Sequence, residues 1–235
     1  MGELSLRNST ELEMNILTID TDYISDNYLG GVIGDLVSSS PPLSDSYWNF
    51  IVDHVRPSEA SMSENRNNIR YIFKVFMQSL KEGTKVVFGV HHDTILCHIP
   101  ESAKDLRILN IDHHNDIAYT WDQKVRAEEY GDCTEANWVS VLNSRISEYT
   151  WVGNQTSAKY TGKEAEPYLY TEIDNTEDRD NLDYAATKWD LVYVCLSPNY
   201  TYDTHWIYFY LLLDLYETVS GTKLVVDSTR YSNRF

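Results

Sequence analysis

The stretch RILNIDHHND, residues 107–116, joins a short apolar run to a dense group of acids and histidines. Its first half, 107–111, is rich in Ile and Leu, which is typical of a strand covered on both faces of a sheet. Side chains two residues apart on a strand face the same way, so Asp112, His114 and Asp116 are expected to share a side. The stretch therefore predicts a buried strand that carries ionisable groups to its carboxyl end.

Four other apolar runs have the same character, and helical patterns lie between some of them. The predicted strands are 15–19, 85–90, 107–111, 190–196 and 223–227. The predicted helices are 63–83, 135–146 and 204–221, with Gly83 and Gly221 as expected stops for the first and last. Alternation of strands and helices predicts an α/β fold, with a mostly parallel central sheet flanked by helices.

The length of 235 residues and the apolar fraction of 42% are compatible with one domain that has a substantial core. We expect an N-terminal tail at 1–14 and a single α/β domain at 15–235. Residues 145–188 give no pattern from which structure or function can be predicted.

The formal net charge of −17 argues against nucleic acid as a partner, because a phosphate backbone would be repelled. A metal, a cationic ligand or a basic peptide would be attracted. Cys97, Cys133 and Cys195 form no CxxC motif, which fits free thiols in a reducing cytoplasm. There is no pattern of a signal peptide, and the longest apolar run, 206–216, is too short for a membrane span and contains Asp214. The sequence thus predicts a cytoplasmic protein without a membrane partner.

Three of the predicted strands are followed at once by acids and histidines. These residues are Asp20 and Asp22 after the first strand, His91, His92 and Asp93 after the second, and Asp112 to Asp116 after the third. In α/β sheets, ligands bind beyond the carboxyl ends of the strands. We therefore expect these groups to meet at one edge of the sheet.

Four carboxylates at one edge would repel one another unless a cation neutralised them. The candidates are Asp20, Asp22, Asp112 and Asp116, and with one or two histidines they suffice for two divalent ions if some of them bridge. A ligand set rich in carboxylates favours Mn or Mg over a structural zinc site. A pair of such ions supplies hydroxide at neutral pH. The alternative is that these are ordinary polar residues at strand ends that cap helices or line turns.

The motif NIDHHND has the DxHxD pattern and resembles the arginase and ureohydrolase superfamily. The stretch VVFGVHHD (86–93) resembles the strand that supplies the single histidine ligand of that superfamily, and TIDTDYIS (18–25) resembles its second DxD motif. The segments 135–142 and 192–203 are similar to a branch that includes bacterial peptide arginases. The resemblance implies an arginase/deacetylase-like three-layer sandwich, in which the DxD strand is permuted to the N-terminus.

The same resemblance implies a role for each residue in a site with two Mn²⁺ ions. Asp112 and Asp20 would bridge both ions. Asp116 and either His91 or His92 would complete one ion, whereas His114 and Asp22 would complete the other. His113 would point away as a structural histidine. Glu135 lies near the place of the proton shuttle, although a glutamate that favours a helix start is an equally good interpretation.

The function implied is hydrolysis of arginine residues in a precursor peptide to ornithine, with release of urea. Two other enzyme families share part of the pattern. The triplet Asp112–His113–His114 matches the name-giving motif of the DHH phosphoesterases, but the small turn expected after the DxD is missing. Phosphoryl transfer from a DxD nucleophile would place Thr or Val at position 24, which is Ile24. A non-catalytic acidic protein that binds a basic peptide is a further alternative.

Overall fold

A computed structural model describes residues 12–24, 59–118, 121–154, 157, 170–173, 179, 182–198, 201, 205–229 and 231. Six parallel strands form one sheet in the order β2-β6-β1-β3-β4-β5. The strands are β1 (Leu12–Asp20), β2 (Lys85–Gly89), β3 (Ala103–Ile111), β4 (Ile146–Val152), β5 (Tyr170–Ile173) and β6 (Leu191–Cys195). The predicted α/β fold with a parallel sheet and flanking helices is confirmed.

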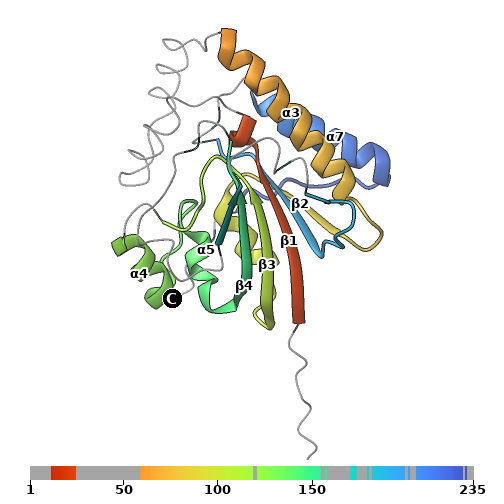
Figure 1. Cartoon of the computed structure of the whole chain (residues 1–235). Helices are drawn as coiled ribbons and strands as arrows, with labels where there is room; N and C mark the ends of the chain where they lie inside the picture. Colours follow the sequence, from red (N-terminus) through yellow and green to blue (C-terminus); the bar gives the residue numbers. More distant parts are fainter. Residues whose placement is uncertain are drawn as a thin grey trace, which may run out of the picture.

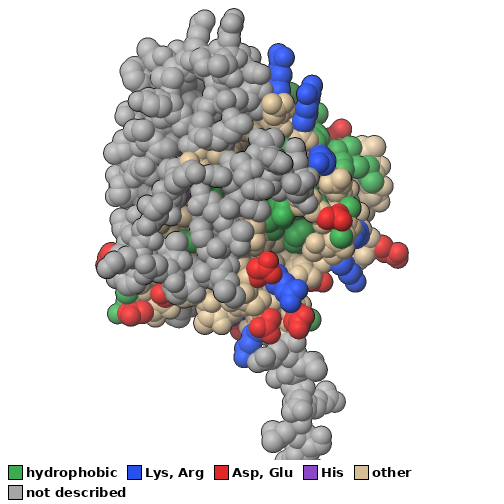
Figure 2. Space-filling model, viewed as in Figure 1, with side chains coloured by type: hydrophobic (Ala, Val, Ile, Leu, Met, Phe, Trp, Pro, Cys, Tyr) green, Lys and Arg blue, Asp and Glu red, His purple; other side chains and the backbone are tan. Residues whose placement is uncertain are grey.

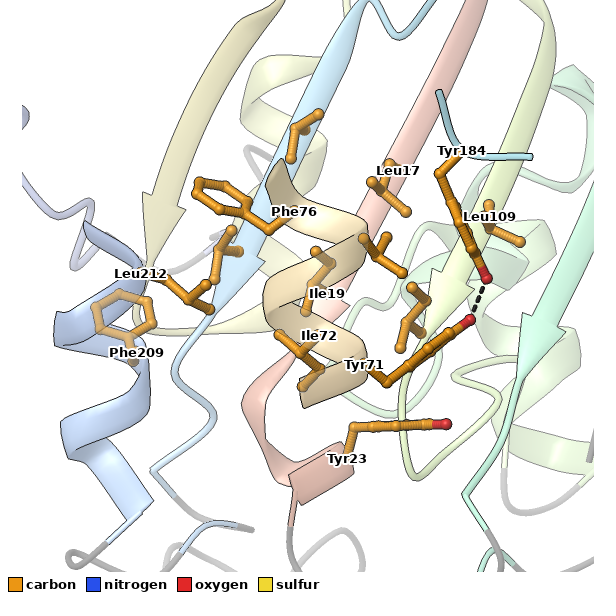
Figure 3. Packing of buried hydrophobic residues seen from close by; sticks show 14 of the residues in the cluster. Leu17, Ile19, Tyr23, Tyr71, Ile72, Phe76, Leu109, Tyr184, Phe209 and Leu212 are labelled. Atoms are coloured by element: carbon orange, nitrogen blue, oxygen red, sulfur yellow. Dashed lines mark hydrogen bonds between the residues drawn. The ribbon is translucent and has the colours of Figure 1, made fainter. Parts of the chain in front are cut away.

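One face of the sheet is covered by two long helices. These are α3 (Glu59–Ser79) and α7 (Trp206–Ser220), which lie side by side in Figure 1. Figure 3 shows Ile72 and Phe76 of α3 and Phe209 and Leu212 of α7 directed into the core. The strands contribute the alternate residues of this face, among them Leu17, Ile19, Val86, Phe88, Leu109, Ile111, Val192 and Val194. This face accounts for every second residue of the apolar runs, and the opposite face accounts for the others.

The other face is covered by shorter elements, which gives three layers in all. These elements are the 3-10 helix η2 (His92–His98), α4 (Trp121–Tyr130) and α5 (Trp138–Val141). Trp138 and Val139 pack there against Ile16, Ile108 and other alternate strand residues. The side chains of the central strand β1 alternate between the two faces of the sheet, and both faces are covered.

Successive strands are added on opposite sides of β1 within the sheet. The chain passes from β1 through α3 to β2, which lies beyond β6 on one side of β1. It then passes through η2 to β3, which is the neighbour of β1 on the other side. The carboxyl ends of the middle strands are level, because Ile19 pairs with Ile111 and Asp20 pairs with Cys195. In open α/β sheets such a reversal opens a crevice for ligands at the carboxyl edge.

Some sequence-based boundaries were wrong. The strand β1 begins at Leu12, so 12–14 belong to the sheet and not to an N-terminal tail of 1–14. The predicted helix 135–146 is reduced to α5 and to the 3-10 helix η3 (Asn143–Arg145), and Ile146 already begins β4. Pairing of β4 with β3 prevails over the local helical spacing, because it buries Tyr149 and Trp151.

The predicted strand 223–227 is also wrong. Only an isolated bridge joins Asp227 to Gly89, through hydrogen bonds from Val90 N to Asp227 O and from Asp227 N to Phe88 O, each 2.8 Å long. Leu224 and Val226 pack against the core, but Val225 between them is 93% exposed, so the segment is covered on one side only and burial does not favour a full seventh strand.

The ends of the two long helices are close to the prediction. Gly221 ends α7 with φ of 69°, the left-handed conformation that favours glycine, and its amide donates to Glu217 O. Helix α3 ends at Ser79, four residues before the glycine at position 83 that the sequence suggested as its stop. Among the described residues, no helix combines the length and the hydrophobicity that crossing a bilayer requires.

Replacing Phe209 by Ala should lower the free energy of unfolding by about 3–5 kcal/mol, because it removes a fully buried ring. The Phe209 ring meets the Phe88 ring edge-on, with 5.4 Å between the centroids. The matched control is Tyr210→Ala, in the neighbouring residue that is 50% exposed, for which a change within about 0.5 kcal/mol is expected. Denaturant titration followed by circular dichroism measures both values, and equal effects of the two substitutions would contradict the described packing.

Candidate metal centre

Six of the residues proposed as metal ligands meet at the carboxyl edge of the sheet. They are Asp20, Asp22, His92, Asp112, His114 and Asp116, and each is at most 6% exposed. They come from the ends of three parallel strands: β1 continues into η1 (Thr21–Ile24), β2 into η2, and β3 into the turn at 112–116. The expectation that three separate stretches of chain converge is therefore met in the geometry.

His92 lies at the centre of one half of this cluster. Its Nδ1 atom is 3.1 Å from Asp20 Oδ2, 3.1 Å from Asp112 Oδ2 and 2.9 Å from Asp116 Oδ2. Its Nε2 atom shares a 2.6 Å hydrogen bond with Thr18 Oγ1. When Nε2 donates to Thr18, Nδ1 presents its lone pair to the carboxylates, which is the form in which imidazole binds a metal ion.

The short contacts of His92 Nδ1 do not have hydrogen-bond geometry, but they are short enough for ion pairs. Burial lowers the pKa of His92, yet the carboxylates of Asp116, Asp112 and Asp20 raise it well above its usual value, so this place favours a proton or another cation. Although three carboxylate oxygens surround this buried atom, it makes no hydrogen bond with any described residue. Adjacent ligands at right angles around an ion, each about 2.1 Å from it, are about 3.0 Å apart. The contacts of His92 Nδ1 thus have the spacing of neighbouring ligands. The ligand atoms of His92, Asp112 and Asp116 lie close enough together to hold one cation, whereas Asp20 groups with His92 but not with this set.

The second half of the cluster is built around His114. Its Nδ1 atom is 3.0 Å from Asp22 Oδ2 and 3.9 Å from Asp112 Oδ1. Three groups of ligand atoms result: one from His92, Asp112 and Asp116, one from Asp22, Asp112 and His114, and one from Asp20, His92 and Cys195. Asp112 belongs to the first two groups, with one oxygen toward each histidine. This partition can accommodate two ions that share Asp112.

Burial and mutual repulsion perturb the titration of the carboxylates. Burial, together with the charge of Asp112, raises the pKa of Asp22 to about 6. Burial and the charges of Asp116 and Asp20 raise the pKa of Asp112 to about 7. Burial by itself would lower the pKa of His114, but its hydrogen bond with Asp22 and the neighbouring negative charges raise it to about 9. Excess negative charge in a dry site favours the uptake of positive charge, as protons or as a metal ion.

Backbone amides and indole groups hold the carboxylates in position. His114 N donates to Asp112 Oδ1 over 2.8 Å, and His113 N donates to Asp22 Oδ1 over 3.2 Å. Asp116 has φ of 53°, and its carboxylate accepts a 2.6 Å hydrogen bond from Trp138 Nε1. Supporting hydrogen bonds of this kind are what orient the ligands of metal sites.

The structure distinguishes between two adjacent histidines, His91 at the N-cap of η2 and His92 at the start of η2. His92 enters the carboxylate cluster, whereas His91 lies beside Glu135, with 2.5 Å between Nδ1 and Oε1. Tyr193 Oη donates to His91 O over 2.6 Å and fixes the turn. Glu135 lines the same cavity as Asp20, Asp22, His92, His114 and Asp116, and it is 8% exposed. Glu135 is therefore placed at the edge of the cluster, next to His91.

His113 stays out of the carboxylate cluster, as expected, but it is buried rather than solvated. Its ring packs edge-on against His114, with 4.8 Å between the centroids. Burial and the neighbouring His114 lower its pKa to about 3, so it is neutral at physiological pH.

Two residues at the end of β6 were missed at the sequence level. Ser197 donates a hydrogen bond to Asp20 Oδ2, and Cys195 lies within reach of the same ion position as Asp20 and His92. Burial raises the pKa of the Cys195 thiol well above its usual value. The signal was present, because 190–196 was predicted as a strand and its carboxyl end belongs to the same edge.

The space enclosed by the cluster is small. Its volume is about 10 Å³, which is close to the minimum for one water molecule. The cavity therefore suits ions and water, and Glu135, Ala136 and Ser197 line it beside the proposed ligands.

Comparisons of this chain with protein-family models, with curated proteins and with solved structures gave no match.

If the cluster binds Mn²⁺, adding the ion to the EDTA-treated protein should raise its unfolding temperature. At 100 times the dissociation constant, the gain is about 2.7 kcal/mol. Asp112→Asn should abolish this gain, and without metal it should be at least as stable as the wild type, because it removes one buried negative charge. Differential scanning calorimetry with and without Mn²⁺ measures both effects.

The matched control for that experiment is Asp122→Asn, at an exposed carboxylate in the first turn of α4. It should keep the full response to Mn²⁺. A response that survives in Asp112→Asn, or that disappears in Asp122→Asn, would show that the ion binds elsewhere.

Proposed function

We propose that this chain is a hydrolase with two Mn²⁺ ions that converts arginine residues of a precursor peptide to ornithine and releases urea. The observation that carries the proposal is the packing of His92 Nδ1 against three carboxylates at 2.9–3.1 Å without a hydrogen bond. The DxHxD motif at 112–116 and the DxD motif at 20–22, which resemble those of the arginase superfamily, supply these three carboxylates and also Asp22, which lies beside His114.

In this proposal, each half of the cluster holds one ion. His92 and Asp116 would hold the first, His114 and Asp22 would hold the second, and Asp112 and Asp20 would serve both. A ligand set dominated by carboxylates favours Mn²⁺ over zinc. Two such ions supply, when bound, the acidity that makes water a nucleophile at neutral pH. The permuted position of the DxD strand at the N-terminus belongs to the same proposal.

The protein's own groups account for the rest of the chemistry. A guanidinium is cationic and planar, so it needs an acidic partner that the ions leave un-neutralised, and the net charge of −17 attracts it to the protein. Hydrolysis requires a proton for the departing amine, and Glu135 is placed to deliver it, since its carboxylate lines the cavity and also contacts His91. We therefore assign Glu135 as the general acid and base, with His91 as its positioning partner.

A peptide substrate is favoured over free arginine by the resemblance of 135–142 and 192–203 to peptide arginases, and by the net charge of −17, which attracts basic peptides. Cys97, Cys133 and Cys195 are free thiols, which is consistent with the cytoplasm as the site of action.

The reaction is tested by co-expressing the chain with an arginine-containing peptide. Mass spectrometry should find a loss of about 42 Da per modified arginine, the mass difference between arginine and ornithine expected for guanidine hydrolysis. Asp112→Ala and Asp20→Ala should each abolish the loss and the Mn-dependent release of urea. Near-normal turnover by either variant would contradict the assigned site.

Two other results would favour the alternative functions. Release of phosphate from a phosphodiester, without urea, would identify the phosphoesterase. A purified protein that binds no Mn²⁺ would favour a non-catalytic peptide binder.

The role of Glu135 is tested separately by Glu135→Gln, which keeps the shape of the side chain and removes its acid–base function. We expect urea release to fall by about 10²–10⁴-fold, with unchanged stabilisation by Mn²⁺. Steady-state assays of urea and calorimetry with Mn²⁺ measure the two quantities. The control is Glu129→Gln at an exposed position of α4, which should leave both unchanged. A Glu135→Gln enzyme with full activity would refute the assignment.

A further inference from the structure

The outer side of α3 carries a row of cations on a protein that is otherwise acidic. Arg66, Arg70, Lys74 and, just beyond the helix end, Lys81 are exposed, and their spacing of four, four and seven residues keeps them on one side. The whole chain has 19 Lys and Arg against 36 Asp and Glu. Within the described part of the chain, none of these four cations takes part in an ion pair. We call this row the basic ridge.

An apolar stripe runs beside the ridge on the neighbouring helix. Ile207, Tyr210 and Leu211 of α7 are 56%, 50% and 45% exposed, and Met77 of α3 is 41% exposed. Positions 207, 210 and 211 share one helical face, which continues to the exposed Asp214. Figure 2 shows Lys and Arg side chains in a row over α3 and hydrophobic side chains beside them, toward α7.

Both features are unfavourable in an isolated molecule. Like charges four residues apart on a helix repel each other. Large apolar side chains that cluster on a surface mark a site of interaction. The inner faces of the same two helices are already used, since Phe76, Phe209 and Leu212 fill the core. The outer face is thus a second surface, which the fold itself does not require.

We infer that the basic ridge and the apolar stripe together form a docking surface for an acidic peptide segment that carries apolar side chains. Such a segment places carboxylates on the ridge and apolar residues on the stripe, as an amphipathic helix does on a complementary helical surface. An anionic membrane is a poorer occupant, because a broad negative surface would repel a protein of net charge −17. A two-fold contact with a second copy would bring two basic ridges together, which is repulsive.

The position of this surface connects it to the metal centre. Helix α3 begins at the end of the sheet where β1 ends, as Figure 1 shows. Asn68 Nδ2 donates to Tyr23 O over 3.2 Å, and Tyr23 directly follows the proposed ligand Asp22. A segment held along α3 is therefore held at a fixed position relative to the carboxyl edge of the sheet.

The test uses the full chain and a labelled peptide of about 14 residues, or four helical turns, with Glu and Leu at amphipathic spacing. Fluorescence anisotropy at low salt should show binding, and Arg66→Gln/Arg70→Gln/Lys74→Gln should weaken it about tenfold, because three exposed charge pairs are lost. Ile207→Ser/Leu211→Ser should weaken it to a similar extent. The matched control is Lys104→Gln/Arg107→Gln/Lys188→Gln, which changes the net charge equally at the other end of the sheet and should keep affinity within about twofold.

Several outcomes would overturn the assignment. The first is that the peptide does not bind, and the second is that it binds equally well to the ridge variant. The third is that phosphatidylserine vesicles bind and the peptide does not. The fourth is that the protein self-associates and the ridge variant does not. Circular dichroism verifies that each variant is folded. Asp112→Ala should bind the peptide normally, so the failure of the hydrolase proposal and the failure of this docking surface give different results.

Discussion

Burial of like charges at the carboxyl edge of a parallel sheet is the constraint on which the rest of this structure depends. Asp20, Asp22, Asp112 and Asp116 lie within a few ångströms of two histidines and are almost fully shielded from water. Carboxylates in such a place repel one another and lose their hydration, which is costly unless protons or cations compensate. The fold has to supply enough favourable packing to hold them together.

That packing comes from the central position of β1. The strand is paired on both sides, with β3 and β6, and covered on both faces, by α3 and α7 and by η2 and α5. The same alternation that sends Leu17 and Ile19 to one core sends Thr18 to the other side, where it holds His92. The indole N–H groups of Trp138 and Trp151 donate hydrogen bonds to the carboxylate of Asp116 and to the backbone carbonyl of Asp112, respectively. The site is thus anchored by the core and not by loops alone, which limits how far these side chains can move apart.

Charge is distributed differently inside and outside. The buried centre gathers carboxylates, whereas the outer side of α3 gathers cations on a chain with a net charge of −17. A cationic group is drawn to the first and an anionic segment to the second. A peptide with an arginine in one part and acidic residues in another would satisfy both surfaces at once.

The sequence by itself determined the fold class and most of the candidate site, because both depend on local alternation. Asp20, Asp22, Asp112, His114 and Asp116 could be placed at one edge, since residues after parallel strands meet there. The choice between His91 and His92 could not be made, because adjacent residues at a strand end differ only in how the chain turns, and Tyr193 and Thr18 decide that turn from distant strands. The run 223–227 resembles a strand but stays outside the sheet, while the predicted helix 135–146 is cut short and β4 begins at Ile146 to pair with β3. Tertiary structure decided these cases, because a sequence pattern shows which side of a segment is apolar but not whether another layer is there to cover it.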